Sequence, residues 1–142
     1  MTTADRRESL PLEANLSLGI IGFHLGVAAL HGAAHLHYEI PLAMWQHVFI
    51  VVVIFLAPLL AGGLVLVREL RAGAWLLLIS MAGAALFGIY FHFLLIGPDN
   101  VSSIGLDSWG FVFLGTAIFL AATEVWGVTA AVRLLRATRR PS

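Results

Sequence analysis

Five of the six histidines in this chain lie inside stretches that are apolar enough to enter a lipid bilayer. Lipid cannot solvate ionisable side chains, so such residues are rare in membranes and usually face a protein interior where they have a function. Imidazole nitrogens can ligate a transition metal, hold a haem iron or relay protons. These first candidates for a functional site are His24, His31, His35, His47 and His92.

The types of residue available restrict the chemistry of such a site. The chain contains no cysteine, which excludes thiolate ligands and leaves imidazole and carboxylate as the strong ligands. His31 and His35 are one helical turn apart and can chelate one ion from a single helix face. Adding His47 or His92 would complete the three or four nitrogen ligands that zinc or copper accepts. Alternatively, His31 or His35 and His92 could be the two axial ligands of a haem b.

Four long apolar runs must position these side chains. The 142 residues are 60% hydrophobic and only 11% charged, whereas soluble domains have roughly 25% charged residues. Each run exceeds the roughly 20 residues that cross a bilayer, and unalternating runs in lipid must be helices. We predict an all-α integral membrane four-helix bundle with antiparallel up-down topology, kinked at Pro58. The expected helices cover residues 16–38, 42–67, 74–96 and 109–132.

The basic residues predict how the bundle lies in the membrane. All eight are arginines, and they occur near the two chain ends and in the middle connection, which an even number of crossings places on one side. The positive-inside rule assigns that side to the cytoplasm. We expect a multi-pass plasma-membrane protein with both termini cytoplasmic: an N-terminal segment 1–14, a bundle over 15–133 and a basic tail over 134–142. The formal net charge is zero, so nothing indicates binding to nucleic acid.

The depths of the histidines along their predicted helices favour a shared site. At a rise of 1.5 Å per residue, four histidines from three helices fall in one outer-leaflet slab about 6 Å thick. Any single one of them is explained as a neutral side chain that hydrogen-bonds between helices. Four together favour a bound haem, copper ion or zinc ion, with Asp99 in the next loop guarding access. The four are His31, His35, His47 and His92.

Two other functions stay open. Glu124 lies about 22 Å from the outer end of its helix, close to the depth of His24. A carboxylate there is costly unless it is protonated or paired, so a His24–Glu124 pair would suit a small proton- or cation-coupled transporter or channel. The third possibility is a structural or accessory subunit without a ligand. The chain has no Gly-rich phosphate loop or nucleophile elbow, so we do not predict a stand-alone enzyme.

The first predicted helix carries small residues on the face opposite its histidines. Small residues at helical spacing allow two membrane helices to approach closely. We therefore expect this face to pack against protein, and a homodimer is one way to cover it. The stripe consists of Gly19, Gly22, Gly26, Ala29 and Ala33.

Overall fold

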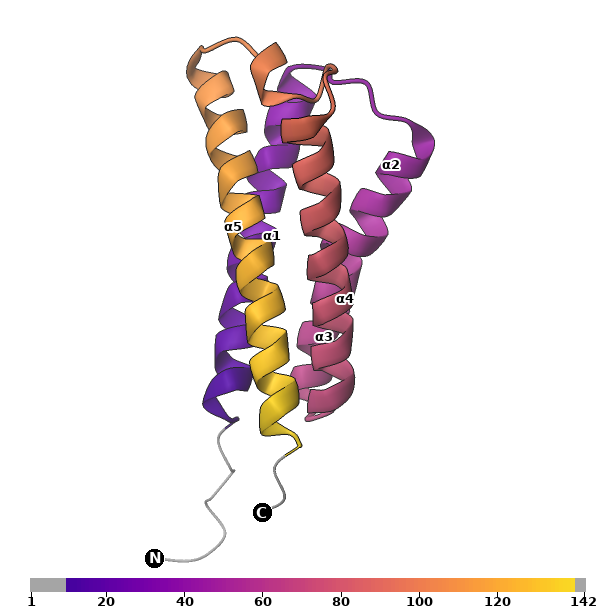
Figure 1. The fold of residues 1–142 in the computed structure, drawn as a ribbon, viewed down its shortest axis with the longest axis vertical. Helices are drawn as coiled ribbons and strands as arrows, with labels where there is room; N and C mark the ends of the chain where they lie inside the picture. The colour runs from indigo at the N-terminus through magenta and orange to yellow at the C-terminus, as the bar shows by residue number, and fades with distance from the viewer. Residues whose placement is uncertain (1–9, 140–142) are drawn as a thin grey trace, which may run out of the picture.

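The chain is helical throughout the part that the structure describes. The structure is a computed structural model that describes residues 10–139, and this range contains no strand. Consecutive helical segments run in opposite directions (Figure 1). The predicted all-α class and the four apolar helices are confirmed. The four segments long and apolar enough to cross a membrane are Leu12–His37, Met44–Leu66, Leu70–Leu94 and Ser108–Ala137.

Two of these segments change helix type along their length. A π-helix widens the turn by one residue and re-aims the side chains that follow it. The second segment contains one between two α-helices, and the third ends in one. The helices are α1 (Leu12–His37), α2 (Met44–Phe49), the π-helix η1 (Ile50–Leu56), α3 (Ala57–Leu66), α4 (Leu70–Ile89), the π-helix η2 (Tyr90–Leu94) and α5 (Ser108–Ala137), with a short 3-10 turn, η3 (Val101–Ser103), before α5.

At the arginine-rich end, α1, α4 and α5 extend beyond the predicted apolar runs. The added residues are mainly good helix formers (Leu, Glu and Ala in α1, Leu, Arg and Ala in α4 and α5), so the backbone hydrogen bonds continue beyond the apolar runs. The helix α5 therefore includes the first residues of the predicted basic tail. The rest of that tail from residue 140 onward, and residues 1–9 of the predicted N-terminal segment, lie outside the described residues.

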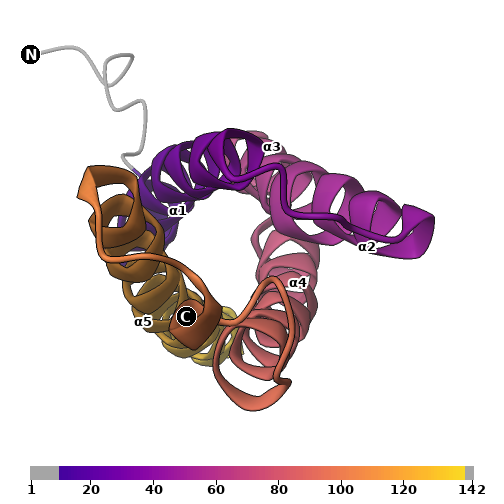
Figure 2. The same cartoon turned by 90° about the horizontal axis from the view of Figure 1, so that it is seen from above.

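Seen from above, the helices surround a common axis in the order α1, α3, α4 and α5 (Figure 2). Small residues allow close contact between neighbours. A Cβ atom at Gly127 of α5 would lie 2.6 Å from Met81 Cγ of α4. A Cβ atom at Gly73 of α4 would lie 2.9 Å from the Ala61 carbonyl oxygen of α3. Glycine at these two positions is therefore what sets the spacing of α4 from α5 and from α3.

In the second segment, the part that forms α2 leans away from the bundle (Figures 1 and 2). Pro58 has no N–H to offer the Ile54 carbonyl one turn earlier, and η1 precedes it. That carbonyl accepts a hydrogen bond from His24 Nε2 of α1 over 3.2 Å. The predicted bend is present: the backbone of α2 leans outward, while its Phe49 ring still stacks on Phe87 of α4 at a centroid distance of 4.6 Å.

The stripe of small residues on α1 does not pack inside the described chain. A Cβ atom at its three glycines would meet nothing within 4 Å, and Ala29 is exposed. Ala33 is half-buried. A homodimer through this face stays a prediction.

Candidate metal centre

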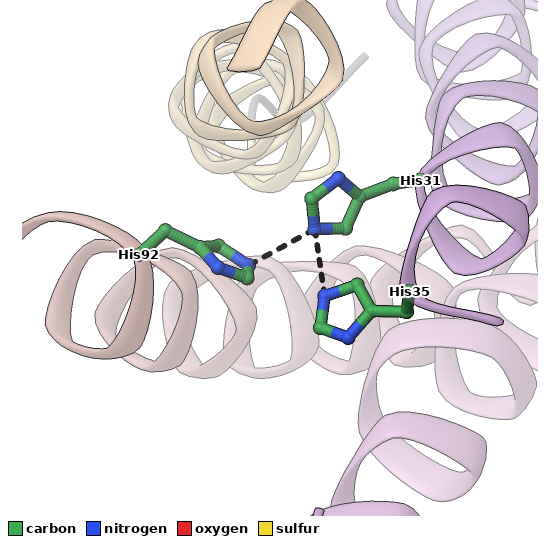
Figure 3. A group of neighbouring side chains, drawn as sticks. All are labelled: His31, His35 and His92. Atoms are coloured by element: carbon green, nitrogen blue, oxygen red, sulfur yellow. Dashed lines mark hydrogen bonds between the residues drawn. The ribbon is translucent and has the colours of Figure 1, made fainter. Parts of the chain in front are cut away.

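Three imidazoles meet between α1, η2 and α5 (Figure 3). His31 and His35 come from successive turns of α1, and His92 faces them from η2. His31 Nε2 lies 3.2 Å from His92 Nε2 and 3.1 Å from His35 Nε2. One ligand nitrogen from each ring lies within 4.8 Å of the others. In the described part of the chain, this is the cluster of side chains that could hold a metal ion.

An aromatic ring packs against all three imidazoles. Phe113 of α5 is fully buried, and its centroid lies 4.8 Å from that of His31, 5.2 Å from that of His35 and 5.6 Å from that of His92. A large apolar ring in this position excludes water from that side of the cluster. It also restricts the rotamers that the imidazoles can adopt.

Thr116 of α5 orients His31. The Thr116 hydroxyl donates to the Val112 carbonyl over 2.6 Å, so its oxygen can accept from His31 Nδ1–H over 2.8 Å. This arrangement suits the tautomer with the His31 proton on Nδ1, in which Nε2 keeps its lone pair. Metal-ligating histidines are commonly fixed by an outer partner of this kind.

Asp99 orients His92 from the loop that follows η2. His92 Nδ1 lies 3.1 Å from the Asp99 backbone oxygen and 3.1 Å from Asp99 Oδ1. Both oxygens are acceptors, so Nδ1 carries the proton and His92 Nε2 also keeps its lone pair. Asp99 Oδ1 lies 3.1 Å from His35 Nε2 as well. One carboxylate therefore contacts two of the three histidines.

The loop turns Asp99 inward because its neighbour is tied to the backbone. Asn100 Nδ2 donates to the Leu95 carbonyl over 2.9 Å, and Asn100 Oδ1 accepts from the Ser102 N–H over 3.0 Å. Asp99 and Asn100 are consequently both buried. Burial by itself raises the pKa of the Asp99 carboxyl, but the adjacent His35 and His92 side chains outweigh it and lower this pKa to about 2. The cluster therefore has a negative charge beside it at neutral pH.

An acceptor lies beside Nδ1 of both His31 and His92, so the Nε2 atoms of both rings can serve as ligands. These two Nε2 atoms face each other over 3.2 Å. With the protons of both rings on Nδ1, the two Nε2 lone pairs point at each other, and a cation between them would turn their repulsion into attraction. Their separation is also close to the edge of about 3.3–3.4 Å in a tetrahedron with metal–nitrogen bonds of 2.0–2.1 Å.

The cluster lines one cavity of about 330 Å³, together with Asp99. Glu124 lines the same cavity from further along α5, and His47 and Glu39 line it from the side of α2 and the α1–α2 connection. A cavity of this size holds a small molecule or several waters. The small and apolar side chains between these groups include Ala28, Gly32, Phe87, Gly88, Ala117 and Leu120.

The structure brings three of the predicted site residues together and leaves the others apart. His31, His35 and His92 form the cluster, whereas His47 is exposed and its Nδ1 bonds to the Ala43 carbonyl of its own helix. The lean of α2 explains why His47 lies outside the ligand group although its depth matches.

The predicted His24–Glu124 pair is not formed by a hydrogen bond between the described residues. His24 Nε2 bonds to the Ile54 carbonyl, and Glu124 Oε2 is buried without a hydrogen-bond partner. Both side chains are almost completely buried, at 0% and 2% exposure. Glu124 therefore lines the cavity as a lone carboxyl group.

Two residues of the site were not among the predicted ligands. Thr116 lies eight residues after Ser108, the first residue of α5, and this puts it about 12 Å deep, close to the depth of His31. This agreement in depth with His31 could have identified Thr116 from the sequence. Asp99 was expected only to guard access, because no local sequence pattern shows that its loop folds back over the histidines.

The fold and the site together define a class: a bundle of four apolar helices with a buried histidine cluster that could hold a metal ion. Comparisons of the chain with protein-family models, with curated proteins and with solved structures found no match.

Proposed function

We propose that this protein is an integral membrane protein that binds one divalent transition metal ion, zinc first, through Nε2 of His31, His35 and His92. The observation that supports this most directly is the approach of His31 Nε2 and His92 Nε2 to 3.2 Å, with an acceptor beside Nδ1 of each ring. Imidazole ligands suit zinc and copper, and zinc accepts the tetrahedral spacing without any thiolate.

The third ligand and the fourth position follow from the surroundings of His35. His35 Nε2 lies 3.1 Å from Asp99 Oδ1 and 3.1 Å from His31 Nε2, so a proton on this nitrogen has an acceptor on both sides. An ion would replace that proton, and the ring would carry its proton on Nδ1. The fourth position is then left for water or for the Asp99 carboxylate, as in zinc sites that keep one position open.

A single ion is favoured over the haem b that the sequence also allows. Two axial bonds of about 2 Å each require about 4 Å between the ligand nitrogens, with the macrocycle between them. His31 Nε2 and His92 Nε2 are only 3.2 Å apart, and His35 stands beside both. A haem would have to separate these rings and displace His35.

We infer that the ion is handled or sensed near the outer face of the plasma membrane. The arginines of the described chain, from Arg68 to Arg139, belong to the middle connection and the C-terminal end, away from the histidine cluster. By the positive-inside rule that end is cytoplasmic, which puts both termini inside and the cluster in the outer leaflet. A cation-coupled transporter or channel is the second candidate, because Glu124 lines the same cavity as the cluster.

The test is the metal content of the protein purified in detergent. Elemental mass spectrometry should find about one zinc or copper ion per chain, and the visible spectrum should show no Soret band. Cobalt(II) exchanged into the site should give the intense visible bands of a tetrahedral complex. A chain that takes up no metal from a solution with excess zinc, or that shows stoichiometric haem, would reject this proposal.

Replacing Thr116 by valine tests the support of His31. Valine keeps the shape of the side chain but removes the acceptor for His31 Nδ1–H, so zinc affinity should fall about 10- to 100-fold. Affinity is measured by competition with a chelator. The matched control is Thr123→Val, since the Thr123 hydroxyl bonds only within α5, to the Leu120 carbonyl. Equal losses in both variants would show a general packing effect instead.

A further inference from the structure

Glu124 is a buried acidic side chain that the proposed ligand set does not use. It is 2% exposed, and it lines the same cavity as the three histidines. Its Oε2 has no hydrogen-bond partner in residues 10–139. The neighbouring Thr123 hydroxyl is already used within α5. A polar group that is buried, unpaired and directed into a cavity requires an explanation, because leaving it so is costly.

Gly88 shows how near Glu124 lies to the cluster. A Cβ atom at Gly88 would be 3.8 Å from Glu124 Oε2 and also 3.8 Å from His92 Cδ2. The carboxyl oxygen and the imidazole are therefore separated by no more than twice that distance. Over such a distance in an apolar interior, a carboxylate interacts strongly with a bound cation without touching it.

The charges of the site do not balance without Glu124. Neutral imidazoles contribute no charge, and Glu39, the third carboxylate that lines the cavity, is exposed to solvent. Of the buried carboxylates, Asp99 alone would leave a bound dication with one uncompensated positive charge. Net charge inside a membrane protein is costly where no water solvates it. Asp99 and Glu124 together supply the two negative charges that a dication needs.

We propose, on the basis of the proposed function, that Glu124 is the second counter-charge of the metal site and makes it select divalent ions over monovalent Cu⁺. With both carboxylates ionised, the site compensates the charge of a dication. With Asp99 alone, it compensates the charge of a monovalent ion. Glu124 thus determines specificity through the valence of the ion, whereas the histidines determine the ligand type.

The experiment compares Zn²⁺ and Cu⁺ affinities of the full chain in detergent and of its Glu124→Gln variant. Glutamine keeps the size of the side chain and removes the charge. We expect Zn²⁺ affinity to fall about tenfold or more while Cu⁺ affinity is unchanged or rises. Zn²⁺ is measured by competition with a fluorescent chelator, and Cu⁺ under ascorbate with a colorimetric one. The matched control is Glu13→Gln, at the opposite end of α1 from the cluster, which should change neither affinity.

A second variant keeps the test decisive if the glutamine protein folds poorly. Glu124→Asp retains the charge and should retain the preference of the wild-type chain for Zn²⁺. An equal loss for both ions in Glu124→Gln, unchanged affinities, or an aspartate variant that behaves like the glutamine one would overturn this inference. In those cases the wild-type chain still binds zinc. A wild-type chain that binds neither ion would instead overturn the proposed function itself.

Discussion

Replacing His31 by alanine is expected to lower zinc affinity by about a hundredfold to a thousandfold. His31 Nε2 is the nitrogen that lies within 3.2 Å of both other ligands, so its loss removes the centre of the cluster. Structural zinc sites gain on the order of 10–16 kcal/mol from all their ligands, which is about 3–4 kcal/mol for each. At 1.4 kcal/mol per tenfold, this gives the expected loss. The measurement is a chelator competition on the full chain in detergent.

The control for this prediction is another histidine of the same cavity. His47→Ala removes an exposed imidazole that also lines the cavity but lies outside the cluster, and it should change zinc affinity less than about threefold. Thermal unfolding without metal should be compared for both variants, because His31→Ala also leaves the Thr116 oxygen without its donor. If His47→Ala weakened binding as much as His31→Ala, the ligand set proposed from the cluster would be wrong.

The fold was largely predictable because lipid leaves few options. A run of more than 20 apolar residues has to pair its own backbone groups, so the four helices followed from length and composition. Length and composition did not predict where the helices end near the arginines, because a helix continues beyond the apolar run when the next residues favour the helical state. The bend at Pro58 could be expected, but the π-helical turns η1 and η2 have no sequence signature.

The histidine cluster was predictable in part. The i, i+4 spacing put His31 and His35 on one face, and depth brought His92 to their level. Depth does not say how far a helix stands from the bundle axis, and so it could not tell that α2 leans away with His47. Which loop covers the site depends on tertiary contacts, so the role of Asp99 had no local signal.

Depth was also misleading for His24 and Glu124. The two residues lie at a similar level of the bundle, yet His24 bonds to the Ile54 carbonyl. That carbonyl is available because Pro58, one turn later, has no N–H. Pro58 therefore has two effects. It leaves the Ile54 carbonyl free to accept the hydrogen bond from His24, and it turns α2 away from the cluster. Glu124 is left to line the cavity.

Replacing Gly73 by valine is expected to destabilise the bundle by about 3 kcal/mol. A Cβ atom there would lie 2.9 Å from both the Ala61 carbonyl oxygen and Val65 Cγ2 of α3, and 3.2 Å from the Val65 nitrogen. Backbone atoms cannot move aside, so α3 and α4 must separate and lose their packing. The measurement is the equilibrium of unfolding in mixed micelles with increasing denaturing detergent.

The matched control for Gly73→Val is Gly63→Val on α3. Gly63 is exposed, and a Cβ atom there would meet nothing within 4 Å, so valine should cost less than about 1 kcal/mol. Equal losses would mean that valine itself, and not the contact between α3 and α4, is what the bundle cannot accept. Gly73 belongs to the first turn of α4, whereas His92 follows the end of this helix. The fraction of Gly73→Val protein that stays folded should therefore bind zinc with nearly wild-type affinity, which separates the stability of the bundle from the chemistry of its site.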